Sequence, residues 1–199
     1  MQSWRSYLDE SEEELKFDKH LENTFRKILN IFGPQMKDTA DQAAEQADDQ
    51  QTVELDEGIL FGLGVTLAAP AIVKIFTGIA KVFGNSIQGW TGSDPGINRV
   101  ADKIIKMADE AHHLFQKPIK YFVTKVLRIK DKDKVDQATG ILYNLLVGFL
   151  MIYSGVGAAK AVEAGKTTLA GFEGALAAIK GGEVTAFIKN SLSRVAGVE

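Results

Sequence analysis

The chain has 199 residues, of which 45% are apolar and 25% are charged, proportions typical of a folded protein. It contains no cysteine, which excludes disulfides, thiol chemistry and the commonest structural zinc sites. The formal net charge of −3 argues against nucleic-acid binding, because contact with phosphates requires a concentrated basic face.

Residues 1–57 form an acidic region with 15 acidic residues against 6 Lys or Arg, a balance of −9. The region has no apolar stretch near Met1, so we expect no secretory signal peptide. Ser11 and Glu14 form a capping-box pattern, which predicts a helix start. The apolar residues that follow at helical spacing are Phe17, Leu21, Phe25, Ile28, Leu29 and Phe32.

This amphipathic helix is predicted to end at Gly33 and Pro34, a dipeptide that usually marks a turn. Residues 35–57 are then rich in Gln, Asp, Ala and Glu and contain hardly any large apolar side chain. Such a segment can bury little surface, which favours a solvated helix or a flexible linker. We therefore separate residues 1–57 from a helical domain formed by residues 58–199.

Two long apolar segments follow this boundary. Residues 58–83 are uncharged as far as Val73, and their aliphatic and aromatic residues occur on every helical face. Pro70 predicts a kink rather than an end, because apolar sequence continues beyond it. Residues 137–159 carry no formal charge. Both segments exceed the roughly 18–20 residues that a membrane-spanning helix needs, if the Lys74 side chain extends to the headgroups.

The connection between these segments begins with a predicted helix start at Ser93, Asp94 and Pro95, a capping residue followed by proline in the first turn. Pro118 is predicted to break or restart this helix. The apolar residues at helical spacing before it are Ile97, Val100, Ala101, Ile104, Ala108, Ala111 and Phe115.

A basic amphipathic stretch follows Pro118. Its apolar face runs from Ile119 to Leu127, and the opposite face is basic. Such a helix favours binding to the anionic headgroups of a lipid bilayer. The residues predicted to contact headgroups are Lys120, Lys125, Arg128 and Lys130.

The C-terminal part shows apolar residues at helical spacing on both sides of Gly181 and Gly182, which predicts packing helices. These residues are Val162, Leu169, Phe172, Leu176 and Ile179, then Val184, Phe187, Ile188, Leu192 and Val195. We find no strand pattern and no repeat. The sequence therefore predicts an all-α protein, in which two long apolar helices form a membrane hairpin or a buried hairpin flanked by amphipathic helices.

No motif supports catalysis. Residues 165–168 (Gly-Lys-Thr-Thr) resemble the end of a phosphate-binding loop, but Lys160 occupies a position where that loop requires glycine. His112 and His113 are adjacent and therefore point to different helix faces, which disfavours a shared metal ion. We therefore predict no enzyme activity, no cofactor and no metal ion.

Glycines within the apolar segments are candidates for close helix packing. Gly58 and Gly62 form a GxxxG pair in the first segment, and Gly148 and Gly155 lie in the second. Small residues let helix backbones approach closely in lipid. The same glycines would also let two buried helices pack inside a soluble bundle.

Residues 1–10 resemble the capsid-targeting peptides of internal head proteins in T-even-type tailed phages. Those peptides begin with Met, carry aromatic residues at similar spacing, and end in Leu or Ile, any residue, and Glu, after which the phage protease cuts. Leu8 and Glu10 match that ending, and Leu55 and Glu57 match it again. The resemblance implies processing at both sites, with capsid or other virion proteins as partners.

These features favour a membrane-active phage-type virion or host-targeting protein that inserts an apolar helical hairpin without catalysis. We expect it in the virion or the host cell membrane, as a homo-oligomer that binds anionic headgroups. One alternative is a holin-like membrane protein with two spans. Another is a soluble helical-bundle or scaffold protein that buries the hairpin, an arrangement that pore-forming colicin domains resemble in outline.

Overall fold

The computed structural model describes residues 4–49, 57–92, 94–165 and 171–197. Over these ranges the chain is 88% helical, with seven helices and no strand, which confirms the predicted all-α fold. The helices are α1 (Trp4–Asp49), α2 (Glu57–Gln88), α3 (Ile97–Val126), α4 (Lys132–Tyr153), α5 (Ala158–Gly165), α6 (Phe172–Gly181) and α7 (Val184–Ala196).

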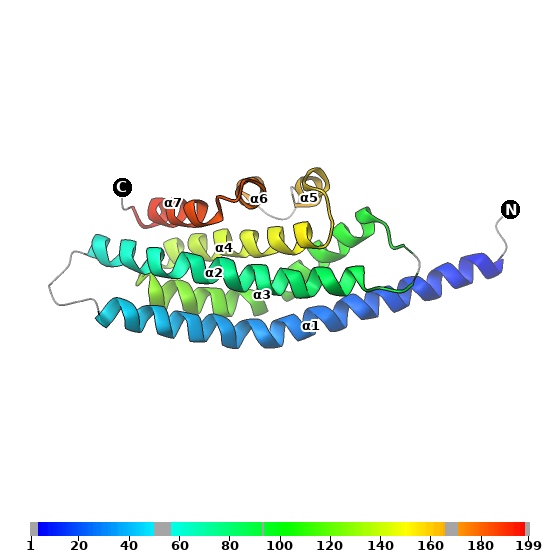
Figure 1. Cartoon of the computed structure of the whole chain (residues 1–199), viewed down its shortest axis with the longest axis horizontal. Coiled ribbons are helices and arrows are strands. Elements are labelled where there is room, and N and C mark those ends of the chain that lie inside the picture. Colours follow the sequence, from blue (N-terminus) through cyan, green and yellow to red (C-terminus); the bar gives the residue numbers. More distant parts are fainter. Residues whose placement is uncertain (1–3, 50–56, 93, 166–170, 198–199) are drawn as a thin grey trace.

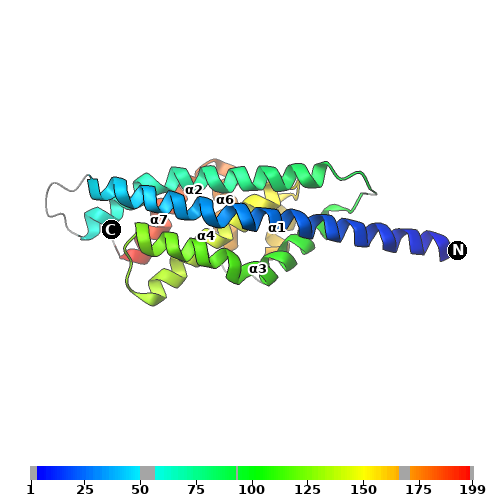
Figure 2. The ribbon, with the colours of Figure 1, turned by 90° about the horizontal axis from the view of Figure 1, so that it is seen from below.

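The four long helices run along one axis, and the three short helices form a layer on one side of them (Figure 1). α4 packs against α2, α3 and all three short helices, whereas α1 packs on α2 and α3. Figure 2 shows α1 side by side with α2, with its N-terminal part extending beyond the other helices. α4 is therefore the central helix of the bundle.

The predicted apolar stripe of α1 is buried: Phe17, Leu21, Phe25, Ile28 and Phe32 belong to the same hydrophobic core as residues of α2, α3 and α4. Aromatic rings connect α1 to α4 through both intervening helices, and each ring pair contributes about 0.5–1.5 kcal/mol beyond burial. The two series of ring contacts are Phe32–Phe76–Phe149, with centroids 6.2 and 6.4 Å apart, and Phe25–Phe115–Tyr143, with centroids 5.3 and 6.4 Å apart.

The predicted helix end at Gly33 and Pro34 is wrong, because α1 continues through both residues. The predicted start at Ser11 is also wrong, because α1 begins earlier. Residues 36–47 bury mainly alanines, which have the highest helix propensity and allow close packing, so this part of the predicted linker is a packed helix. The buried residues there are Met36, Ala40, Ala43, Ala44 and Ala47.

Three prolines lie inside helices: Pro34 in α1, Pro70 in α2 and Pro118 in α3. The predicted break at Pro118 is therefore wrong, whereas α2 continues past Pro70 as expected. An interior proline removes a backbone hydrogen bond and costs about 3 kcal/mol. Pro34 and Pro70 are exposed and Pro118 is half-buried, so the unpaired carbonyls can turn toward water while the opposite faces stay buried.

α2 contains the predicted apolar segment and continues to Gln88, but it is not apolar on every side. Residues such as Ile72 and Phe76 are buried, while the opposite strip of the helix faces solvent. The expectation that apolar residues occupy all faces of this segment is therefore wrong. The exposed strip consists of Thr66, Pro70, Lys74, Gly78, Lys81, Val82 and Asn85.

α4 fits the expectation of an apolar helix better, since residues 145–151 are all buried. Its bounds differ from the predicted 137–159, because it begins at Lys132 and ends at Tyr153. Gly155 has a φ of 81°, a conformation that favours glycine. The chain therefore turns there toward α5 instead of extending the apolar helix.

α3 begins later than predicted, because Gly96 has a φ of 72° and directly precedes the helix. The Asp94 carboxylate accepts a hydrogen bond from the Gly96 N–H at 2.9 Å, and Pro95 lies outside the helix. Ser93 lies outside the described residues. The apolar stripes predicted for α3, α6 and α7 pack on the core, except that Ile97 is exposed.

We expect Gly84→Ala to destabilise the protein, because a Cβ atom there would overlap the carbonyl oxygen of Tyr153 at the end of α4. Gly78→Ala is the matched control, since a Cβ at this exposed position of α2 meets no atom within 4 Å. The control should be stabilised by about 0.5–1 kcal/mol through helix propensity. Urea unfolding followed by circular dichroism measures both variants, and equal stabilities would contradict the close approach of α2 to α4.

Candidate functional site

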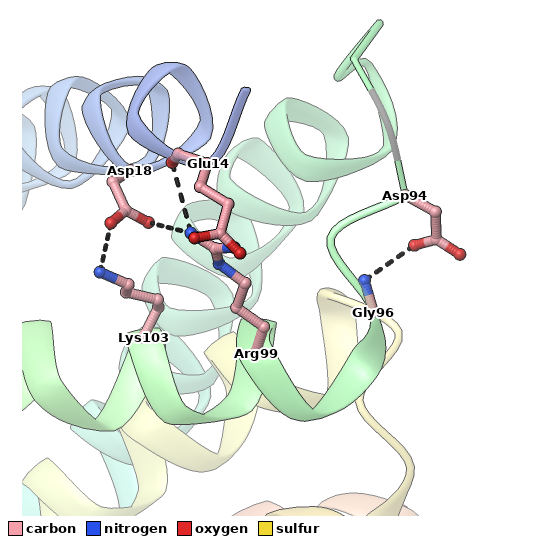
Figure 3. Close-up of polar contacts among 6 residues, drawn as sticks. All are labelled: Glu14, Asp18, Asp94, Gly96, Arg99 and Lys103. Atoms are coloured by element: carbon pink, nitrogen blue, oxygen red, sulfur yellow. Dashed lines mark hydrogen bonds and ion pairs between the residues drawn. The ribbon is translucent and has the colours of Figure 1, made fainter. Parts of the chain in front are cut away.

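Acidic residues of α1 pair with basic residues at the start of α3 (Figure 3). Arg99 forms ion pairs with Glu14 and Asp18, and its guanidinium also donates to the backbone carbonyl of Glu14 at 3.4 Å. Lys103 Nζ donates to the other oxygen of Asp18 at 2.5 Å. The Asp18 carboxylate therefore holds two cations of α3, and all three of these side chains are only a quarter to a third exposed.

A second group of contacts joins the other end of α1 to the end of α3. Asp48 pairs with Arg128, and Asp41 accepts a hydrogen bond from the Tyr121 hydroxyl at 2.7 Å. This hydrogen bond raises the pKa of Tyr121, because the ionised phenol could no longer donate it. Acidic residues near both ends of α1 thus contact residues near the two ends of α3.

The four basic residues predicted to contact lipid headgroups lie at the end of α3 and just beyond it. Arg128 pairs with α1, and Lys120 Nζ pairs with Asp136 of α4 at 2.7 Å. The hydrogen bond from Lys120 lowers the pKa of Asp136. Lys125 and Lys130 are exposed, and neither forms an ion pair with a residue that the structure describes. Half of the predicted set therefore forms surface ion pairs within the chain.

A polar cluster joins α1 to the C-terminal part of α2. His20 Nε2 lies 2.9 Å from both the carbonyl oxygen and the Oγ of Ser86, and Thr24 Oγ1 lies 2.7 Å from the same Oγ. The His20 ring packs on Trp90, with centroids 5.2 Å apart. The cluster fixes the register of α1 against α2. Sequence reasoning missed it, although His20 and Thr24 are one turn apart beside the apolar stripe of α1.

The predicted packing glycines have different roles. Gly62 makes no close approach, since an added Cβ would meet nothing within 4 Å, so the proposed GxxxG contact is wrong at this residue. Gly148 does pack closely, because its Cβ would lie 2.9 Å from Ile179 of α6. Gly155 supports a turn instead. The sequence analysis missed Gly64, whose Cβ would lie 2.6 Å from the carbonyl oxygen of Val126.

The predicted processing residues lie at both ends of the acidic region. Leu8 and Glu10 belong to α1, in a part where only the backbone is described. Leu55 lies outside the described residues, and Glu57 is the first residue of α2. Residues 166–168 of the loop-like motif also lie outside them, after the end of α5.

The two adjacent histidines point in different directions, as predicted. The His112 ring packs edge-on against Tyr143, with centroids 4.6 Å apart, whereas His113 is exposed. Within the described ranges, no three or more His, Asp or Glu side chains are arranged to hold a metal ion. The absence of metal and catalysis stays a prediction.

Two helices are long and apolar enough to cross a membrane, α2 over residues 62–88 and α4 over residues 132–153. Within their most apolar windows, 67% of the α4 residues and 44% of the α2 residues are buried. The core helix of a water-soluble protein has the same length and composition, so these properties alone do not establish a span. The bundle buries α4 without lipid.

We expect Tyr143→Phe to lower stability at neutral pH by about 1 kcal/mol, because the buried hydroxyl donates to the carbonyl of Ala108 at 2.5 Å. Burial and the nearby Asp109 raise the pKa of Tyr143 above its ordinary value of 10.0. Above pH 10 the unfolded chain loses this proton more readily than the native state, so the contribution of Tyr143 declines as pH rises.

The stability difference between the wild type and Tyr143→Phe, measured from urea midpoints, should therefore be smaller above pH 10 than at neutral pH. Other titrating groups affect both proteins equally, so the difference between them isolates Tyr143. A difference that stays constant across this range would show that Tyr143 is not held in its neutral form by burial.

Comparisons of the chain with protein-family models, curated proteins and solved structures found no match. The resemblance to phage capsid-targeting peptides therefore depends on residues 1–10 and 55–57 alone.

Proposed function

We propose that the chain is a non-catalytic, membrane-active protein, and that the bundle is its water-soluble form. The observation that carries this proposal is the position of α4. This helix is apolar enough to span a bilayer, yet it packs against α2, α3, α5, α6 and α7. Insertion requires these helices to separate from α4. The lipid then replaces the protein side chains that cover it.

The layer of short helices supports release on one side of α4. α5, α6 and α7 have 8, 10 and 13 residues, lengths at which a helix depends on packing for its stability. Gly155 follows α4, and Gly171 and Gly182 flank α6, all three with positive φ. These turns divide the layer into short segments that can leave α4 without unfolding the long helices.

On the other side, α1 would have to leave α2 and α3. Its apolar stripe packs on both helices, and its acidic residues neutralise Arg99 and Lys103 of α3 and Arg128, which follows α3. The protease-site resemblance at Leu55 and Glu57 agrees with a release of α1, because cleavage there would cut the covalent link between α1 and α2. On that resemblance we propose the virion and the host membrane as locations, with capsid proteins and further copies of the chain as partners.

The charged residues of α4 all lie at its N-terminal end, which leaves the rest of the helix free to enter a bilayer. Its first five residues carry Lys132, Asp133, Lys134 and Asp136, and residues 137–153 are uncharged. Seventeen helical residues span about 26 Å, somewhat less than the roughly 30 Å hydrocarbon core of a bilayer. Residues 154–159 are also uncharged and would complete the span if the turn at Gly155 became helical. Helical backbone groups remain hydrogen-bonded in lipid.

A second candidate function is a soluble structural or scaffold protein. The solvent-exposed strip of α2, with Lys74, Lys81 and Asn85, favours this candidate, because a helix that only spanned a bilayer would have no need of it. In this case α4 never leaves the core. The two functions differ in whether α1 and α2 separate in the presence of lipid.

A disulfide between α1 and α2 tests this difference. The chain has no cysteine, and the oxygens of Thr24 and Ser86 are 2.7 Å apart, so a Thr24→Cys/Ser86→Cys variant places two thiols in reach of each other. The reduced variant is expected to integrate into anionic liposomes and to resist extraction with alkaline carbonate. The oxidised variant should be extracted, because the linked helices cannot separate.

The single variants Thr24→Cys and Ser86→Cys are the controls, since each loses the hydrogen bond without gaining a covalent link. Both should integrate whether or not an oxidant is present. Complete extraction of the reduced double variant and of the wild type would exclude the membrane-active function and favour the structural one.

A further inference from the structure

An open groove of about 680 Å³ runs between α1 and α2 on the surface of the bundle. Its floor is apolar and includes Ile28, Ile75 and Ile79. Ile31 and Val82 stand on its two sides and are 47% and 53% exposed, although both are large apolar residues. Figures 1 and 2 show α1 and α2 lying side by side, as their packing contacts require.

The exposed strip of α2 beside this groove is basic. Residues 58–88 of α2 contain Lys74 and Lys81 and no acidic residue. Both lysines are exposed, and neither forms an ion pair with a residue that the structure describes. Among the described residues, Asp38 of α1 and Lys74 of α2 are the charged residues that line the groove, and Lys81 lies on the exposed strip of α2 beside it. By contrast, α1 neutralises Arg99 and Lys103 of α3 and Arg128, which follows α3 (Figure 3 shows the first two).

We propose that this face of α1 and α2 is the surface through which the folded bundle docks on an anionic lipid bilayer. Exposed Ile31 and Val82 would enter the interface between headgroups and acyl chains, and Lys74 and Lys81 would contact anionic headgroups. The inference rests on the proposed membrane activity and names the surface that meets the bilayer before α4 is released. It also assigns a role to the solvent-exposed strip of α2.

Docking is tested separately from insertion with the oxidised Thr24→Cys/Ser86→Cys protein, in which α1 and α2 stay together. The probe is sedimentation with vesicles of equal parts phosphatidylcholine and phosphatidylglycerol, compared with vesicles of phosphatidylcholine alone. In this background, Lys74→Gln/Lys81→Gln should weaken binding to the anionic vesicles by about fivefold per lysine at low salt. Ile31→Gln/Val82→Gln should also weaken binding, and Asp38→Asn should strengthen it.

The matched controls change similar residues on other faces. Leu114→Gln alters an apolar residue of α3 that is 44% exposed. Lys125→Gln/Lys130→Gln removes the two lysines that were predicted to contact headgroups and that form no ion pair with a described residue. Both control variants should bind like the parent. Circular dichroism checks that every variant is folded, which is expected because the substituted side chains are exposed.

Loss of binding in Lys125→Gln/Lys130→Gln but not in Lys74→Gln/Lys81→Gln would overturn the proposal and place the docking surface on α3. Failure of the oxidised protein to bind anionic vesicles, while the reduced protein integrates, would also overturn it and leave the membrane activity intact. Binding of the oxidised protein with the expected variant effects supports the docking face even if the reduced protein never integrates.

Discussion

The burial of α4 is the constraint on which the rest of the bundle depends. Residues 145–151 are covered on every side, so helices must pack around α4 in all directions before the chain can be soluble. α2 and α3 fill two sides, and the short helices α5 to α7 fill the remainder. Close contacts at Gly84 and Gly148 bring the backbone of α2 and the side chains of α6 directly onto α4.

The acidic charge of α1 acquires a structural role in this arrangement. α2 and α3 bury apolar residues under α1, which covers both with one stripe of phenylalanine, leucine and isoleucine. Its carboxylates lie beside cations of α3, so that charge attraction and apolar burial favour the same register. The polar cluster of His20, Thr24 and Ser86 adds a fixed point between α1 and α2.

Different faces of the bundle would then serve different steps of membrane action. The groove between α1 and α2, which we propose as the docking surface, is exposed in the folded state. The layer of short helices lies on the opposite side from α1 and covers α4, one of the two helices apolar enough to cross a membrane (Figure 1). Docking through α1 and α2 would leave that layer away from the bilayer, so α4 would be released after α1 separates.

Local patterns in the sequence determined the helices: apolar spacing located the stripes of α1, α3, α6 and α7, and the absence of charge located α4. Tertiary contacts decided the ends and the exposed faces, because packing outweighs a local break at Pro34 or Pro118 and a run of alanines can be buried against a neighbour. Only the fold shows that Lys120 and Arg128 meet acidic partners on α4 and α1. It also shows that α2 is exposed to solvent along the strip that contains Lys74, Lys81 and Asn85, because the neighbouring helices decide which face of a mostly apolar helix is covered.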